Sequence, residues 1–398
     1  AQSSLFIQYY YVVLPLIAIM MFTQYLEIYN MVRMRVAVPA FLREIVLRIL
    51  LILLLFIFIS KLLNEQQFIF GFVLVYGITF VLLLVHTIRK QQFSAYRPSA
   101  FLKNNPGFSQ QISFGFGMLL VTIFTNIHNF LDGIILPAYL GLATLGIYMR
   151  PLVLGQMIQV PYRAISLISI PIIREAIVQN DMKKVQSLNK SISINLFLIG
   201  CFLFTLLIVN ADGIFSLLPI SYASAKSVLY IIATGRLLDM AFGLNSEILN
   251  ASKYFKFITI FSGIMMFLTI GLNMLLIPRY GMNGAAFAVS ISLLVFNILK
   301  SYIIYSKFHF HSFSKTYIPI ILISLGVIVC MHFVPLFQFV QHHMFMNACI
   351  NIVFHAGVAA ILFIGPLLYF RLSPDVNQFA QLVISGKIFK GGHKMEEL

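Results

Sequence analysis

Apolar runs of about 20 residues recur from one end of this chain to the other, and each is long enough to cross a bilayer as a helix. Helices and closed barrels alone satisfy their backbone hydrogen bonds in lipid. Barrel strands are about half as long and alternate in hydropathy, so they are excluded. The chain is 60% hydrophobic and only 10% charged, whereas soluble domains carry about 25% charged residues. We therefore predict an all-α polytopic membrane protein.

Eleven membrane spans are predicted, with mostly short connections. They are 5–30, 38–60, 66–88, 110–135, 143–172, 191–210, 226–249, 255–277, 283–305, 316–334 and 346–369. The longest connection, 89–109, is polar and basic, and predicts a cytoplasmic linker between a first bundle within 1–88 and a six-helix bundle at 110–305. An additional transmembrane helix pair at 306–370 and a cytoplasmic tail at 371–398 complete the division.

The basic residues predict an orientation. With the linker in the cytoplasm, 20 of the 27 lysines and arginines, Lys300 among them, lie on the cytoplasmic side and three lie on the other side. The remaining four are arginines inside spans. Cytoplasmic loops are enriched in Lys and Arg, so the asymmetry supports the orientation and the order of the spans. We read the net charge of +15 as a topology signal, and we expect no nucleic-acid partner.

A short internal repeat supports two related bundles. Glu27-Ile28-Tyr29-Asn30 recurs as Glu247-Ile248-Leu249-Asn250, at an offset of 220 residues, and both motifs end a predicted span on the cytoplasmic side. Parallel repeats of this kind place two bundles around an axis normal to the membrane, with a cavity between them. If the second bundle has six spans, three spans of the first are missing before Ala1.

The stretch from Leu275 to Phe308 joins two apolar helices. Pro278 and Gly281 are expected to end the first helix, and Asn283 to cap the second. Small residues from Gly284 to Ser290 allow close helix packing in lipid, where packing rather than hydrophobicity drives association.

Two segments carry a family resemblance. Ile277 to Ala286 resembles the pattern IPr-G-xx-GAAxA of bacterial polysaccharide flippases of the Wzx type, and Asp132 to Tyr148 resembles their D-xxxG-xxlG-xxxvGxY. These flippases share the MOP superfamily with MATE exporters and the lipid II flippase. The resemblance implies a MATE-like fold of two bundles around a central cavity, with an extra C-terminal helix pair.

The resemblance also implies a function. Such a protein flips polyprenyl-diphosphate-linked oligosaccharide units across a bacterial inner membrane by alternating access, for surface polysaccharides such as the O-antigen of lipopolysaccharide. Its partners would be the lipid-linked oligosaccharide, membrane lipids, a polysaccharide polymerase and a chain-length regulator. No nucleotide-binding motif is present in the sequence, so an ion gradient or the membrane potential would supply the energy.

Charged residues inside spans are costly and are therefore candidate site residues. His128, Asn129 and Asp132 form a polar patch in the span 110–135, and Arg150 begins the next span at the depth of Asp132. Asp132 and Arg150 could form a structural ion pair or face a cavity. His128 could titrate near neutral pH or simply pack in the core.

Arg163 has no acid at helical spacing on its own span, so it is the leading candidate to face a water-filled cavity and bind a phosphate. A partner acid on another helix is the alternative. Arg236 and Asp239 are three residues apart and are expected to pair locally. Arg48, also a cavity candidate, could pair with Glu44 or extend to the cytoplasmic surface. Asp132, Asp239 and His128 are the candidates to bind a coupling ion or proton.

The two repeat motifs predict a cytoplasmic gate. Glu27 with Arg33, and Glu247 with Lys253, place charges at equivalent positions of the two bundles, where pairs could be exchanged between two states. Ordinary charges at helix ends are the alternative.

Other functions have less support. A drug-cation antiporter of the MATE type would need an acidic cavity, and lipid II export is a second transport alternative. A membrane-embedded polymerase or acyltransferase would need catalytic residues on a sizeable outer loop, and the predicted outer loops are short. No catalytic, metal-ligand or cofactor motif appears in the sequence, so we expect neither an enzyme nor a cofactor.

Overall fold

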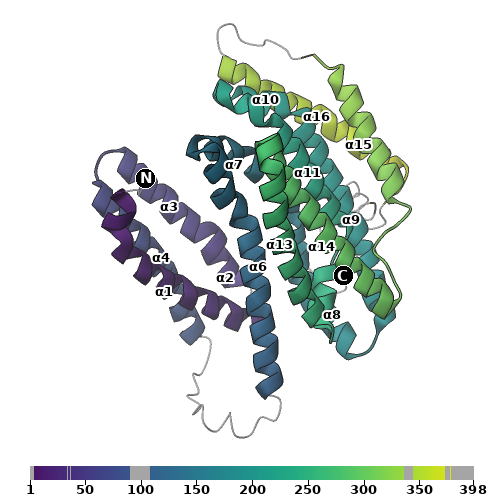
Figure 1. Ribbon diagram of the computed structural model, residues 1–398, viewed down its shortest axis with the longest axis horizontal. Helices are drawn as coiled ribbons and strands as arrows, with labels where there is room; N and C mark the ends of the chain where they lie inside the picture. The colour runs from purple at the N-terminus through teal and green to yellow at the C-terminus, as the bar shows by residue number, and fades with distance from the viewer. Residues whose placement is uncertain are drawn as a thin grey trace, which may run out of the picture. The chain divides into compact units, whose positions relative to one another are not determined.

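The computed structural model describes residues 4–33, 35, 37–89, 108–335, 344–372 and 377. Within these ranges the chain is helical and contains no strand (Figure 1). This confirms the predicted all-α class. The chain divides into two compact units, Ala1–Pro106 and Gly107–Leu398. Most of the predicted linker and nearly all of the predicted tail lie outside the described residues, so their roles stay predictions.

The first unit is organised around α4 (Glu65–Arg89), on which two other helices pack. Its other helices are α1 (Ser4–Val32), α2 (Ala37–Phe41) and α3 (Leu47–Ile59). Both α1 and α3 pack on α4, and a π-helical segment at Leu42–Val46 joins α2 to α3. Asn30 of α1 donates a hydrogen bond to Thr87 Oγ1 of α4 at 2.9 Å, and both side chains are fully buried. A polar contact of this kind fixes two lipid-facing helices in register.

The second unit contains the remaining helices. They are α6 (Phe108–Leu140), α7 (Leu142–Gln156), α8 (Val160–Val178), α9 (Met182–Val209), α10 (Ala211–Ser216), α11 (Lys226–Ala241), α12 (Asn245–Ala251), α13 (Phe255–Tyr280), α14 (Met282–Phe308), α15 (Tyr317–His332) and α16 (Met344–Tyr369). Helices α13, α14, α11 and α6 pack on one another, while α15 and α16 pack together and against α9.

Seven described helices are long and apolar enough to cross a membrane, or eight if the bent pair α11–α12 is one span. The sequence predicted eleven spans, and the difference comes from broken or short helices. Pro161 has no N–H to donate to Met157, and a 3-10 turn at Met157–Gln159 divides α7 from α8. The span predicted at 316–334 is α15, a helix of only 16 residues.

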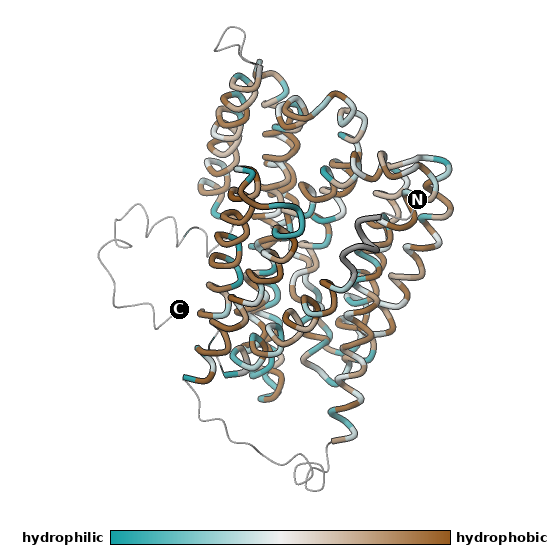
Figure 2. The backbone as a smooth tube through the Cα atoms, turned by 90° about the vertical axis from the view of Figure 1, so that its left-hand side faces the viewer, coloured by the Kyte–Doolittle hydropathy of each residue, from teal (hydrophilic) through white to brown (hydrophobic). Residues whose placement is uncertain are grey.

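The polarity of these helices is inverted relative to a soluble protein. They are hydrophobic along most of their length (Figure 2), yet only 11–44% of each span is buried inside the protein. On α13, Phe267 and Leu275 face outward, whereas Thr269 and Asn273 are fully buried. Water would not tolerate so much exposed apolar surface, but hydrocarbon does. The protein is therefore a multi-pass membrane protein.

The connection between α13 and α14 is a single residue. Gly281 takes a φ of 57°, which favours glycine, and α13 continues through Pro278 up to Tyr280. The prediction that Pro278 helps to end the helix and that Asn283 caps the next one is therefore wrong, because Asn283 instead accepts a hydrogen bond from Ser227 at 2.7 Å. Gly284 permits a close helix approach, since a Cβ atom there would lie 2.2 Å from the Leu276 carbonyl oxygen.

A buried polar network holds the break between α11 and α12. Gly243 takes a φ of 61° at the break. Asn189 of α9 accepts a hydrogen bond from the Leu244 N–H at 3.0 Å and donates one to Ser312 at 2.9 Å. Tyr317 of α15 donates to the Ala241 carbonyl oxygen at 2.8 Å. This network fixes the position of α12, which carries two residues of the site described next.

Candidate functional site

A polar cavity of about 510 Å³ lies inside the second unit. Its walls come from α6, α7, the 3-10 turn, α8, α11, α12, α13 and α14. The cavity is unusual for an apolar bundle because its lining contains both charged and amide side chains. Such groups are expensive in a membrane span unless they face water, a ligand or each other.

Three cations line this cavity, namely Arg163 of α8, Arg236 of α11 and Lys300 of α14. Arg236 and Lys300 are buried, at 6% and 4% exposure. Lys300 donates a hydrogen bond to Ser246 of α12 at 2.8 Å and lies 4.2 Å from the centroid of the Phe296 ring. In the part of the chain that the structure describes, none of the three forms an ion pair within 4 Å. The cavity therefore offers positive charge to a ligand.

The acids beside these cations are already hydrogen-bonded to neutral groups. Asp239 accepts a hydrogen bond from Asn297 at 2.6 Å and a second one from Gln159. Glu247 of α12 accepts from the Tyr162 hydroxyl, with both carboxylate oxygens 2.9 Å away. The predicted local pair between Arg236 and Asp239 is not formed within 4 Å, because the two amides occupy the Asp239 carboxylate.

Besides Gln159, three carboxamides line the cavity: Asn126 and Asn129 of α6, and Gln156 of α7. No hydrogen bond joins their side chains to any other residue in the described ranges. Asn129 is one of the predicted site residues, whereas Asn126 and Gln156 are not.

Asp132 lies apart from the cavity lining, in a buried cluster between α6, α7 and α13. It accepts hydrogen bonds from the Tyr148 hydroxyl at 2.5 Å and from Asn273 at 3.3 Å. His128, which also lines the cavity, lies 2.7 Å from the Thr269 hydroxyl through its Nδ1 atom. The predicted Asp132–Arg150 pair is not formed within 4 Å, because Arg150 stacks on the Tyr222 ring, 5.0 Å from its centroid.

The remaining predicted residues have other partners. In the first unit, Arg48 forms an ion pair with Glu44 at 2.6 Å, one of the two outcomes foreseen from the sequence. That Arg48 faces a cavity stays a prediction. Glu27 pairs with Arg43 at 3.0 Å, while Arg33 lies over the Tyr29 ring.

In the second unit, Lys253 lies over the Tyr254 ring, 5.3 Å from its centroid. Neither Glu27 with Arg33 nor Glu247 with Lys253 is an ion pair among the residues that the structure describes. A gate that joins the two units stays a prediction.

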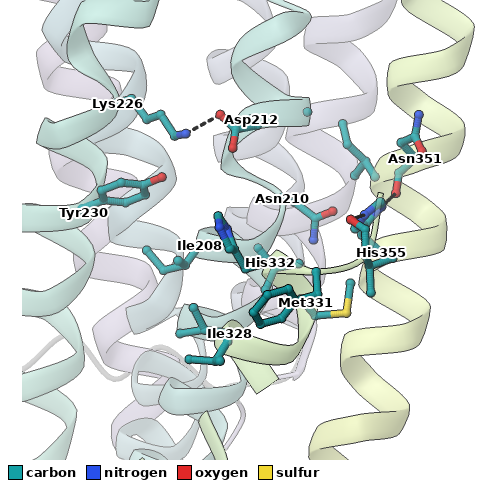
Figure 3. Close-up of a pocket in the computed structure, with 16 residues that line it drawn as sticks. Ile208, Asn210, Asp212, Lys226, Tyr230, Ile328, Met331, His332, Asn351 and His355 are labelled. Atoms are coloured by element: carbon teal, nitrogen blue, oxygen red, sulfur yellow. Dashed lines mark hydrogen bonds and ion pairs between the residues drawn. The ribbon is translucent and has the colours of Figure 1, made fainter. Parts of the chain in front are cut away.

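A larger cavity, of about 750 Å³, lies among α9, α10, α11, α15 and α16 (Figure 3). Two of its charged or polar groups have partners: Lys226 pairs with Asp212, and His355 Nδ1 donates to the Asn351 carbonyl oxygen at 2.9 Å. Since its lysine is neutralised and its lining is mostly apolar, we take the smaller, cationic cavity as the candidate site. Within the described ranges, no three His, Cys, Asp or Glu residues are grouped as metal ligands.

Sequence reasoning missed residues both in the cavity wall and in the neighbouring Asp132 cluster. Lys300 was assigned to the cytoplasmic end of its span, yet it is buried in the cavity wall. Its spacing of three residues from Asn297 in an apolar helix was the available signal, because it places two polar groups on one helix face. Asn273 was missed because a lone amide in an apolar span gives no sign of its partner.

Comparisons with known proteins concern the fold. No protein-family model matches the chain, and no curated protein sequence matches it. A solved structure, the lipid II flippase MurJ in an inward closed conformation, matches with a TM-score of 0.57 over 84% of this chain and 68% of that chain. The two sequences are 14% identical. The chain is thus a multi-pass helical membrane protein whose fold is similar to that of MurJ.

Proposed function

We propose that this protein is a flippase that moves polyprenyl-diphosphate-linked oligosaccharide units across the bacterial inner membrane for surface polysaccharide synthesis. The observation that carries this proposal is the cavity with Arg163, Arg236 and Lys300, none of which has an ion-pair partner within 4 Å in the described part of the chain. The fold similarity to a lipid-linked-substrate flippase supports the same conclusion.

The charge chemistry suits a diphosphate. Each Arg or Lys placed in the middle of a membrane span costs about 2.5–3.5 kcal/mol on insertion scales. Arg236 and Lys300 are buried in the cavity wall, and an anionic ligand or trapped water would offset such a cost. A guanidinium binds two phosphate oxygens at once, and a lysine adds a mobile point charge. A diphosphate can engage all three cations, while its polyprenyl tail stays in the bilayer.

We assign energy coupling to two acids near the cavity, Asp132 and Asp239. Asp132 and Asp239 lie near the cavity cations but are bound by neutral donors rather than by the cations. A coupling ion or proton could therefore bind at either carboxylate, or at His128, without displacing an ion pair. Such binding would bias the helices that hold these residues toward one of two states.

Transport of lipid II is the second candidate, and the fold similarity to MurJ favours it. Export of drug cations has less support, since three cations line the cavity while Asp239 is the lining carboxylate. A polysaccharide polymerase and a chain-length regulator are proposed as partners on the basis of the family resemblance alone.

The proposal is tested in cells that carry the full-length gene. An external sugar-modifying enzyme reports how much lipid-linked oligosaccharide reaches the outer leaflet. We expect Arg163→Ala to trap the unmodified intermediate inside at unchanged protein level. Arg174→Ala is the matched control, because Arg174 is exposed on the same helix and does not line the cavity. Normal export in cells that lack the gene would refute the flippase proposal, and normal export with Arg163→Ala alone would remove that residue from the site.

A further inference from the structure

The unpartnered carboxamides of the cavity are the starting point. Asn126 and Asn129, which are exposed, and Gln156, which is half-buried, line the cavity, and no hydrogen bond joins them to other side chains in the described ranges. A polar side chain in a membrane span without a protein partner must bind water or a ligand. Each amide both donates and accepts hydrogen bonds, which distinguishes this group from the cations nearby.

The hairpin of α6 and α7 places these amides in one layer. The two helices meet at the Gly141 turn, and a Cβ atom added at Gly133 would lie 3.6 Å from Met149, each residue being eight positions from that turn. Asn126 and Gln156 are each 15 positions from Gly141, so they lie at a similar depth on opposite walls. Asn129 lies one helical turn closer to Gly141, on the same wall as Asn126.

Arg163 lies on α8, after the 3-10 turn that divides α7 from α8. The cation and the amides line the same cavity from different helices. A cavity with both kinds of group suits a ligand that has an anionic part and a neutral polar part. The apolar side chains of Phe130 and Val153 also line the cavity and add a surface for the non-polar face of a ring.

We infer that Asn126, Asn129 and Gln156 form a saccharide subsite that binds the sugar hydroxyls adjacent to the diphosphate. This inference rests on the proposed flippase function. Sugar hydroxyls donate and accept hydrogen bonds as carboxamides do, whereas phosphate oxygens only accept, and they are better served by Arg163 and Lys300. The cavity is thus divided into a cationic part for the diphosphate and an amide part for the sugar.

The test compares two probes on the full-length protein in detergent. One probe is farnesyl diphosphate, and the other is farnesyl diphosphate carrying N-acetylglucosamine on its terminal phosphate. Calorimetry measures the dissociation constant of each. We expect the wild type to bind the sugar-bearing probe about tenfold more tightly, because two or three additional hydrogen bonds form. Asn126→Leu with Asn129→Leu should abolish this preference, so that the two probes bind with equal affinity.

Gln156→Met provides a second, independent variant and should reduce the preference about threefold. Met149→Leu is the control, since it changes an apolar lining residue of similar size. Equal affinities for the two probes in the wild type, or an unchanged preference in both amide variants, would overturn the saccharide subsite but not the flippase function. Failure of the wild type to bind either probe would overturn both.

Discussion

The charged residues in and beside the cavity fall into two groups. Asp132, Asp239 and Glu247 are each held by neutral donors on neighbouring helices. Arg163 and Arg236 have no ion-pair partner within 4 Å among the described residues. The first group contributes to the stability of the bundle. In the second group Arg236 is buried and costs stability, whereas Arg163 is exposed, and we attribute the presence of both to ligand binding.

Tyr148→Phe is expected to destabilise the second unit. The Tyr148 side chain is fully buried, and its hydroxyl donates to Asp132. Without it, a buried carboxylate loses one of its two hydrogen-bond donors, which costs about 2 kcal/mol in the free energy of unfolding. Thermal unfolding in detergent measures the loss, with Tyr139→Phe, an exposed tyrosine on α6, as the control. Equal melting temperatures for the two variants would contradict the stabilising role of this hydrogen bond.

Arg236→Met is expected to stabilise the second unit. It replaces an unpaired buried cation by an apolar side chain, which should stabilise the fold by about 1 kcal/mol. The same variant should bind farnesyl diphosphate at least tenfold more weakly, because one charge-assisted contact is lost. Melting temperature and calorimetric affinity are measured on the same preparation. A variant that is both less stable and unchanged in affinity would show that Arg236 is a structural residue.

At the level of helices, the site depends on interruptions of otherwise long spans. The break at Gly243 turns α12 so that Ser246 and Glu247 meet Lys300 and Tyr162. The 3-10 turn after Gln156 similarly lets α8 bring Arg163 to the cavity. Irregular backbone inside a membrane protein is tolerated where it is buried or lines a cavity, and here it does both.

Gly284→Ala tests the close packing of α13 and α14. Its Cβ atom would lie 2.2 Å from the Leu276 carbonyl oxygen, which is backbone and cannot rotate away. We expect a loss of about 2 kcal/mol or more in the free energy of unfolding. Gly271→Ala on α13 is the matched control, because a Cβ atom there meets nothing within 4 Å. Unfolding curves that coincide for these two variants would contradict the packing at Gly284.

The helices themselves were largely predictable, because apolar runs bounded by glycine or polar residues determine them. The breaks were not, since Gly243 and Pro161 do not reveal in sequence whether a helix bends, ends or continues. The interaction partners of the charged residues were predicted least well. Arg150 and Asp132 lie near each other along the chain, yet each found a partner on a helix distant in sequence, Tyr222 for the arginine and Asn273 for the acid.

For the whole molecule, the distribution of basic residues predicts one orientation in the membrane. Lys183, in an exposed position near the start of α9, should lie in the cytoplasm, and Arg279, exposed at the end of α13, should lie outside. In a variant lacking the native cysteines, Arg279→Cys should react with an impermeant maleimide in intact cells, and Lys183→Cys only after permeabilisation. The reverse pattern would invert the topology, and with it the proposed direction of transport.

The central claim is that the cationic cavity of the second unit carries the diphosphate across the membrane. The most direct test reconstitutes the full-length protein in liposomes and measures the rate at which a fluorescent polyprenyl-diphosphate oligosaccharide becomes accessible to an external quencher. We expect Arg163→Gln to slow this rate at least tenfold and Arg174→Gln to leave it unchanged. Equal rates for wild type and Arg163→Gln would contradict the account.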